Sequence, residues 1–288
     1  MRGSIRSSGR PSATGRRREP STRGLELREV EVDGRRIRYR VTGAGMPLVL
    51  VHGLAGSWRW WSPLFQPLAT RRQVNIVDLP RRRGVVRAAD LSDWLCRWLD
   101  AAGLDRVDLA GHSLGGLVAA ELAAIRPERV RRLVLVAPAG IPCGRSVPRR
   151  AFALLEALYD VHAWLPMVAA DAVRTGPLAL IHGVAFVSTR DLRGDRAPVR
   201  APTLLAWGEH DRLMPLRIAE EWQRILPSSR LARLSCGHVP MLEAPQELAA
   251  GMLPFLDEEL ADDPGDQLGA RVVDGVGRAG NADEPPAR

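Results

Sequence analysis

The chain of 288 residues contains no lysine, only three cysteines and no long apolar run. A membrane-spanning helix needs about 20 consecutive apolar residues, so the sequence predicts no transmembrane segment. Residues 1–23 also lack the apolar stretch that a secretory signal requires. Together these absences predict a cytoplasmic protein.

The three cysteines, Cys96, Cys143 and Cys236, are far apart and odd in number. They form neither a C-x-x-C pair nor the spacing that is typical of a zinc site. We therefore expect reduced thiols, no bound metal and no cofactor. Cys236 lies two residues before His238, and we interpret it as a buried structural residue rather than a redox-active thiol.

The formal net charge of +8 is concentrated near the N-terminus, where residues 1–24 carry seven Arg and one Glu. The rest of the chain is close to neutral. Because every basic residue is arginine, the charge indicates a compositional bias rather than a binding stripe. We expect no nucleic-acid partner, while a phosphate- or membrane-binding role for the basic arm stays open.

The length and the apolar content of 45% are sufficient for one α/β domain with an insertion. Residues 1–24 and 261–288 have little apolar periodicity and are predicted to be disordered. Strand and helix patterns alternate through residues 25–140 and 199–260, whereas residues 141–198 contain no convincing buried strand. We predict a mostly parallel, twisted sheet with helices on both faces and a helical cap inserted at residues 141–198.

Hydrophobic patterns predict the individual elements. Alternating segments on either side of Asp33-Gly34 predict a hairpin with a two-residue turn, and continuous apolar runs predict buried parallel strands. The expected strands are 25–32, 36–41, 47–52, 74–77, 106–110, 132–137, 203–207 and 230–235. The expected helices are 89–102, 114–126, 215–226 and 246–259, with 151–159 and 178–186 in the cap.

The most informative motif is Gly111-His112-Ser113-Leu114-Gly115, a G-x-S-x-G pattern between a predicted strand and a predicted helix. A chain that passes directly from strand to helix must bend sharply at Ser113, and a Cβ at either glycine would collide with neighbouring backbone. The bend presents the hydroxyl and places the positive end of the helix beside it. This pattern indicates a serine that attacks a carbonyl carbon.

Such a serine needs a base within hydrogen-bond reach, and the base needs an orienting acid. In open α/β sheets these groups follow the carboxyl ends of strands. Asp211 follows the predicted strand 203–207, and His238 follows the strand 230–235. Each also has an ordinary interpretation, since Asp211 could cap the next helix and His238 could be a simple loop histidine. Glu209 and His210 are neighbouring candidates.

The chain order serine, aspartate, histidine is that of α/β-hydrolases, and residues from about Leu25 to Leu260 resemble this superfamily, in its cap-bearing, esterase-like branch. Four segments in register carry the resemblance: His52-Gly53, Gly111–Gly116, Trp207–Asp211 and Gly237-His238. The resemblance implies the α/β-hydrolase fold and a catalytic triad of Ser113, Asp211 and His238. It also makes His52 a structural residue and favours Asp211 over Glu209 as the acid.

The resemblance further implies an oxyanion hole made by the backbone N–H groups of Leu54 and Leu114. The expected activity is hydrolysis of carboxylic esters through an acyl-enzyme. The substrate is expected to be a small molecule with a small or medium apolar acyl or aromatic group. Trp58, Trp164 and Val239 are the expected substrate contacts.

Other functions stay open at this point. A carbon–carbon bond hydrolase or a lactonase would use the same triad, and the former is favoured if cap arginines such as Arg149, Arg150 or Arg190 bind a substrate carboxylate. A non-catalytic protein that binds a ligand or partner is the alternative from another class. Arg81–Arg83 stand where relatives often carry a Gly-His-Gly-type turn, which changes one wall of the expected entrance.

Overall fold

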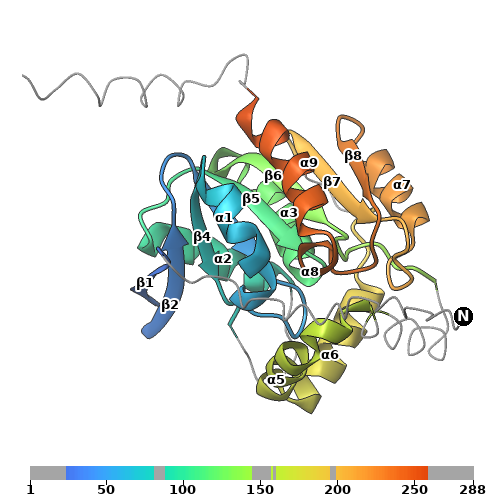
Figure 1. Cartoon of the computed structure of the whole chain (residues 1–288), viewed down its shortest axis with the longest axis horizontal. Coiled ribbons are helices and arrows are strands. Elements are labelled where there is room, and N and C mark those ends of the chain that lie inside the picture. The colour runs from blue at the N-terminus through green and yellow to red at the C-terminus, as the bar shows by residue number, and fades with distance from the viewer. Residues whose placement is uncertain (1–23, 81–87, 145–156, 158–159, 195–198, 259–288) are drawn as a thin grey trace, which may run out of the picture.

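The computed structural model describes residues 24–80, 88–144, 157, 160–194 and 199–258 (Figure 1). Its sheet has the strand order β1-β2-β4-β3-β5-β6-β7-β8. The first two strands form the predicted hairpin and pair antiparallel, as do β2 and β4, while all other neighbours are parallel. The strands are β1 (Glu26–Val32), β2 (Arg35–Thr42), β3 (Pro47–Val51), β4 (Gln73–Val77), β5 (Val107–His112), β6 (Val130–Val136), β7 (Thr203–Gly208) and β8 (Arg230–Leu234).

Helices cover both faces of this sheet, as the apolar runs predicted. Side chains alternate between the two faces along a strand, so in β3 Leu48 packs into one hydrophobic cluster and Val49 into the other. One cluster includes α2 (Ala88–Ala101), α3 (Leu114–Ile125) and α7 (Leu216–Ile225). The other includes η1 (Trp58–Leu64), α1 (Phe65–Ala69), α8 (Pro240–Glu243) and α9 (Pro245–Asp257). The predicted α/β-hydrolase architecture is confirmed.

The described residues of the predicted cap, 141–198, lie between β6 and β7 in the sequence and contain η3 (His162–Trp164), α5 (Leu165–Thr175) and α6 (Pro177–Thr189). We refer to these residues as the cap. Figure 1 shows α5 and α6 at one end of the sheet, apart from the helices that cover its faces. The predicted helix 178–186 lies within α6. The predicted helix 151–159 falls, except for Ala157, outside the described residues, as do residues 1–23, 259–288 and Arg81–Arg83.

Several boundaries differ from the sequence prediction by one or two residues. β6 begins at Val130 rather than at residue 132, because Val130 pairs with Val107 across an irregularity in the ladder. α7 begins after Pro215, which occupies the N-cap position. The short helix α8, directly after His238, was not predicted, and it separates the histidine loop from α9.

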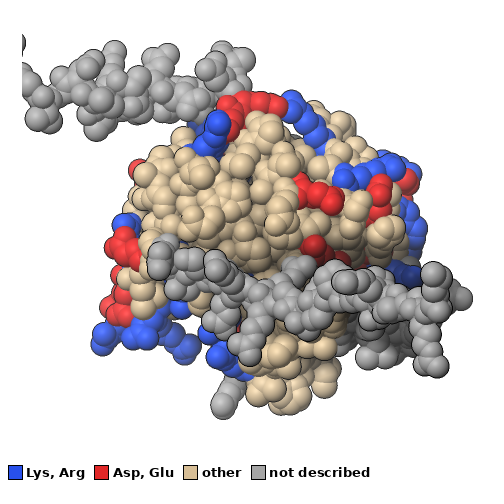
Figure 2. All heavy atoms as spheres, in the orientation of Figure 1, with Lys and Arg blue, Asp and Glu red and all other residues tan. Residues whose placement is uncertain are grey.

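Charged side chains of opposite sign are interspersed around the edge of the face seen in Figure 2. Among the described residues, each helix is either too short or too polar to cross a bilayer. A buried charge cluster in the sheet is formed around Asp108, whose carboxylate oxygens accept hydrogen bonds from Arg131 at 2.9 and 2.7 Å. Arg72 lies 3.4 Å from the same carboxylate.

We expect Asp108→Ala to lower the free energy of unfolding by about 3–5 kcal/mol, because it leaves the buried Arg131 guanidinium without its partner. Urea denaturation of the wild-type and variant proteins measures this difference. The exposed pair of Glu26 and Arg28 provides a matched control, and Glu26→Ala should leave stability almost unchanged. Equal losses for the two variants would contradict the structural importance of the buried pair.

Candidate active site

Ser113 occupies a sharp turn between β5, which ends at His112, and α3, which begins at Leu114. Its φ of 50° and ψ of −113° are values that residues with a side chain rarely adopt. The turn is held from both sides, since the Ser113 amide donates to the Val136 carbonyl at 3.0 Å and its carbonyl accepts from the Ala139 amide at 2.9 Å. These two hydrogen bonds fix the backbone that carries the half-buried Ser113 side chain.

The glycines of the motif are required by close backbone contacts. A methyl group on Gly111 would overlap the carbonyl oxygen of Gly115. A methyl group on Gly115 would lie 2.5 Å from the carbonyl oxygens of Val51 and His52. Because those atoms belong to the backbone, they cannot move aside, and the steric argument made from the sequence is confirmed.

Asp211 and His238 lie on the loops that follow β7 and β8, and their side chains form a buried hydrogen bond. Nδ1 of His238 donates to Oδ2 of Asp211 at 2.8 Å, because an ionised carboxylate can only accept. Oδ1 of Asp211 accepts the backbone N–H groups of Leu213 at 2.9 Å and Met214 at 2.7 Å. The acid is therefore fixed in orientation, and Nε2 is the imidazole nitrogen that can accept a proton.

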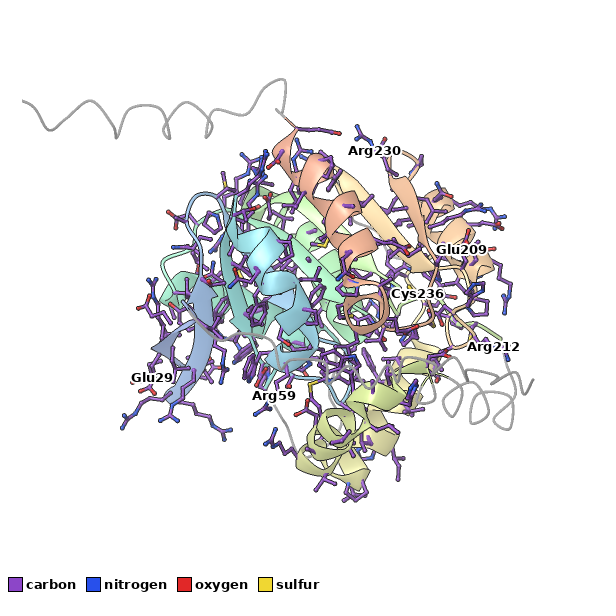
Figure 3. The ribbon with its side chains drawn as sticks, viewed as in Figure 1. Glu29, Arg59, Glu209, Arg212, Arg230 and Cys236 are labelled. Atoms are coloured by element: carbon purple, nitrogen blue, oxygen red, sulfur yellow. The ribbon has the colours of Figure 1, made fainter. Side chains whose placement is uncertain are left out.

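Backbone contacts hold these two loops together. The Glu209 amide donates to the Leu234 carbonyl at 2.9 Å, and the His210 amide donates to the Cys236 carbonyl at 3.0 Å. Figure 3 labels Glu209 and Cys236 on the two loops. A Cβ on Gly208 would overlap backbone oxygens of the histidine loop, so only glycine allows this approach.

The histidine loop also contacts the serine turn directly. Nε2 of His112, the residue before Ser113, donates to the His238 carbonyl at 2.9 Å. The two imidazole rings have their centroids 5.0 Å apart. Burial, with the neighbouring imidazoles of His238 and His52, holds the pKa of His112 well below its ordinary value, so His112 is neutral. The structure thus brings His238 and the serine turn together.

The electrostatic surroundings of His238 favour its protonated form. Burial alone would lower its pKa, but the charge and hydrogen bond of Asp211, together with the charge of Glu243, outweigh burial and raise the pKa above the ordinary value of 6.5. Burial, with several nearby carboxylates, raises the pKa of the Cys236 thiol far above its usual range. Cys236 is buried and present as a thiol, in agreement with the structural role expected for it.

The loop that follows β3 lies against the serine turn. A Cβ on Gly53 would come within 3.2 Å of the Ser113 Cβ. His52 supports this loop, since its Nδ1 donates to the Gly53 carbonyl at 2.7 Å and its Nε2 accepts the Leu79 N–H at 3.0 Å. Both ring nitrogens of His52 are thus engaged with backbone, as expected for a structural residue. We refer to residues 52–57 as the oxyanion loop, because they include the predicted oxyanion residue Leu54.

A pocket with a free volume of about 80 Å³ lies beside the oxyanion loop and the start of α3. Both predicted oxyanion residues border it, and the cap contributes the end of α5 and the inner side of α6. Its lining is mostly apolar and includes Leu54, Leu79, Leu114, Ala179, His182 and Phe186. The first backbone N–H groups of α3 have no partner within their own helix, so the Leu114 amide can face a ligand.

The three predicted substrate contacts do not border this pocket. Trp58 stacks on Phe65 with ring centroids 6.2 Å apart, and the Arg40 guanidinium covers it at 3.8 Å. Trp164 borders a second, more open cavity of about 430 Å³ beside the loops after β7 and β8. Val239 is buried in a hydrophobic cluster. A substrate contact by any of these side chains stays a prediction.

Glu243 is a site residue that the sequence analysis missed. Its carboxylate accepts the backbone N–H of Gly237 at 2.6 Å and that of Val239 at 2.7 Å, so it holds the chain on both sides of His238. Burial raises the pKa of Glu243, although these two hydrogen bonds oppose the shift. The available signal was a glutamate five residues after the histidine, and in the structure it is the last residue of α8.

Comparison with known proteins agrees with this geometry. The sequence model of the alpha/beta hydrolase family matches residues 48–251. The chain belongs to this family. The hydrolase is 30% identical over 245 residues to a pimeloyl-(acyl-carrier protein) methyl ester esterase from Nitrosomonas europaea, which covers 74% of this chain and 97% of that protein.

Two further comparisons concern a second sequence relative and a solved structure. A 2-hydroxymuconate semialdehyde hydrolase from a Pseudomonas species is 28% identical over 266 residues, which cover 80% of this chain and 94% of that protein. The solved structure of an enol-lactonase from Burkholderia xenovorans has a TM-score of 0.71 at 21% identity, and the match covers 80% of this chain and 100% of that one. The structural likeness shows a shared fold.

The described part of the hydrolase holds no group of three or more His, Cys, Asp or Glu side chains that could bind a metal ion. The arrangement at the end of the sheet offers an acid–histidine pair, a serine in a strained turn and a pocket lined by Leu114, the first residue of α3. These are the components of acyl transfer.

Proposed function

We propose that this hydrolase cleaves carboxylic esters of small apolar acyl groups, with Ser113 as the nucleophile. The observation that carries the proposal is the buried hydrogen bond of 2.8 Å between His238 and Asp211. The His238 carbonyl also accepts a hydrogen bond from His112, the residue before Ser113. The esterase relative from Nitrosomonas europaea supports the same reaction class.

In the proposed mechanism, Nε2 of His238 removes the Ser113 proton while the serine oxygen attacks the ester carbonyl carbon. Asp211 holds the Nδ1–H tautomer and stabilises the imidazolium that forms. The imidazolium then protonates the departing alcohol oxygen, which leaves an acyl group on Ser113. Water, deprotonated by His238, then attacks this acyl group. The bond to the Ser113 oxygen breaks, the imidazolium returns the proton to that oxygen, and the acid is released.

The tetrahedral intermediates carry a negative oxygen, which needs fixed donors. We assign these to the backbone N–H groups of Leu54 and Leu114, both of which border the pocket. The positive end of α3 adds to their effect. Loss of one such donor in other hydrolases costs about 3–4 kcal/mol of transition-state stabilisation.

The pocket favours short acyl groups. Its free volume of about 80 Å³ is well below the roughly 300–1,000 Å³ of pockets that hold drug-sized ligands. Its mostly apolar lining suits an alkyl or small aromatic group. We therefore expect kcat/KM for p-nitrophenyl esters to be highest for the acetate to butyrate esters and to fall for longer chains.

The experiment combines this ester series with a serine-reactive fluorophosphonate probe. Turnover of short esters together with labelling of Ser113 supports the proposal. Labelling without ester turnover would instead favour carbon–carbon bond cleavage, which the 2-hydroxymuconate semialdehyde hydrolase relative makes the second candidate. If the protein shows neither labelling nor turnover, the non-catalytic binding protein is the remaining alternative.

One structural observation favours the ester hydrolase over the carbon–carbon hydrolase. Arg190, one of the cap arginines that could bind a substrate carboxylate, instead donates to Glu121 at 3.1 and 2.9 Å. Arg149 and Arg150 lie outside the described residues. Arg190 is thus already neutralised by a carboxylate of α3.

The pH dependence of kcat/KM should reflect the raised pKa of His238. At low pH the imidazole is protonated and cannot take the Ser113 proton, so the rate rises with pH as the group loses its proton. Because the pKa is raised, the midpoint of this rise should lie above 6.5. Initial rates with p-nitrophenyl acetate between about pH 5 and 9 test this. A midpoint below the ordinary value would contradict the stabilisation of the His238 imidazolium by Asp211.

A further inference from the structure

The cap contacts the oxyanion loop at two separate points, one polar and one apolar. At the polar point, the Ser57 hydroxyl donates to Oδ2 of Asp171, in α5, at 2.6 Å. Both residues are buried, with exposed fractions of 1% and 0%. Ser57 ends the oxyanion loop and is the N-cap residue of η1, so a cap carboxylate holds the C-terminal end of this loop.

Charges from both sides of the interface stabilise the Asp171 carboxylate. Its Oδ1 accepts from Arg174 of α5 at 3.0 Å and lies 3.7 Å from the Arg59 guanidinium of η1. Figure 3 labels Arg59 where η1 faces the cap helices. A buried carboxylate that bonds to groups of two elements strongly favours one relative position of those elements.

At the apolar point, α6 lies directly on the side chain of Leu54. A Cβ on Gly183 would overlap Cδ1 of Leu54 and come within 3.0 Å of its Cδ2. An alanine at this position would force the Leu54 side chain to shift away from α6. Leu54 is the residue whose N–H we assign to the oxyanion hole, so the cap contacts the donor residue itself.

Between these two points the loop backbone is tightly turned. The Gly56 amide donates to the Gly53 carbonyl at 3.0 Å, and Ala55 has a φ of 60°, in the left-handed region. A residue with a side chain persists in this region only where its surroundings hold it. The contacts at Leu54 and Ser57 lie on either side of Ala55.

We propose that the cap positions the oxyanion loop, with Asp171 and Gly183 as the positioning residues. The cap thus acts on the Leu54 N–H through Ser57 and through the Leu54 side chain, as well as covering the pocket. This inference rests on the proposed function, since it assigns the cap a part in stabilising the tetrahedral oxyanion.

The test uses the full-length protein and five variants: Asp171→Ala, Asp171→Asn, Ser57→Ala, Gly183→Ala and the double variant of Ser57→Ala with Asp171→Ala. Each is assayed for kcat and KM with p-nitrophenyl acetate. A methyl trifluoromethyl ketone is the second probe, because its adduct with serine carries an oxyanion. Asp191→Asn and Gly194→Ala are matched controls in the cap, since the Asp191 carboxylate accepts from Arg193, two residues along the same loop, and a Cβ on Gly194 would meet open space.

We expect Asp171→Ala, Ser57→Ala and Gly183→Ala to lower kcat by about 10–100-fold with little change in KM. Affinity for the trifluoromethyl ketone should fall by the same factor. Asp171→Asn should recover most of the activity, because its amide oxygen can still accept the Ser57 proton. The double variant Ser57→Ala, Asp171→Ala should be no worse than Asp171→Ala alone, since both act through one bond. The control variants should match the wild type.

The inference is overturned if the wild type is active and Ser57→Ala keeps full kcat and full ketone affinity. It is also overturned if only KM rises in the cap variants, because the cap would then act in substrate binding alone. If Asp171→Ala does not fold, Ser57→Ala still provides the test, because it breaks the same hydrogen bond by removing only one oxygen atom. An inactive wild type would overturn the proposed function instead, and that result is distinct from active protein with unaffected variants.

Discussion

Ser113→Ala is expected to lower kcat for ester hydrolysis by about 10⁶-fold, to near the rate left by binding and oxyanion stabilisation alone. The hydroxyl oxygen is the atom that would form the acyl-enzyme, and no other group can replace it within the turn. Alanine meets the same backbone constraint as serine at φ 50°, so the change removes the oxygen without a new demand on the fold. Initial rates with p-nitrophenyl acetate measure the effect.

The control for this variant is Ser229→Ala. The Ser229 hydroxyl donates to the Leu226 carbonyl in the turn before β8, away from the pocket. Both variants should unfold at temperatures close to that of the wild type. A Ser113→Ala protein that folds and retains most of its turnover would exclude Ser113 as the nucleophile.

Asp211→Asn is expected to lower kcat by about 10⁴-fold with little change in fold. Oδ1 of Asp211 accepts two backbone N–H groups, so the amide oxygen of asparagine must take that place. The amide NH₂ then faces Nδ1 of His238 and donates to it. This forces the proton onto Nε2, the nitrogen that has to accept the proton of Ser113.

The same variant should shift the pH profile in a defined direction. Without the carboxylate charge, burial dominates and the pKa of His238 falls, so the remaining activity should rise at lower pH than in the wild type. Glu209→Gln is the matched control, because Glu209 lies two residues away on the same loop. If Glu209→Gln abolished activity while Asp211→Asn did not, the choice of acid would be wrong.

Local patterns predicted most of the fold. The continuous apolar run 47–52 became β3, buried on both faces, and Asp33-Gly34 formed the two-residue turn with both φ values positive. The start of β6 could not be predicted, because it depends on pairing with Val107 in another strand. The same limit applies to α8, whose four residues are too few for a periodic pattern.

The site was predictable where its chemistry is local or ordered along the chain. The glycines of the motif around Ser113 could be explained from the sequence, because Gly111 makes a close backbone contact with Gly115, only four residues away. The contacts of Asp171 and Gly183 depend instead on distant segments that meet only in the folded chain, and no local signal marks them. Glu243 contacts Gly237 and Val239, which are close in the sequence, but it belongs to none of the recognised motifs. Trp58 was predicted as a pocket residue from its position after the oxyanion loop. In the structure Arg40 of β2 covers its ring, and a substrate contact by Trp58 stays a prediction.

The most direct test of the proposed nucleophile is mass spectrometry of the protein after reaction with a fluorophosphonate. We expect one adduct per chain, on the peptide that contains Ser113, and slow labelling when His238 is replaced by alanine. An adduct on another residue, or equal labelling of the Ser113→Ala protein, would contradict the assignment of Ser113, Asp211 and His238 as the catalytic unit.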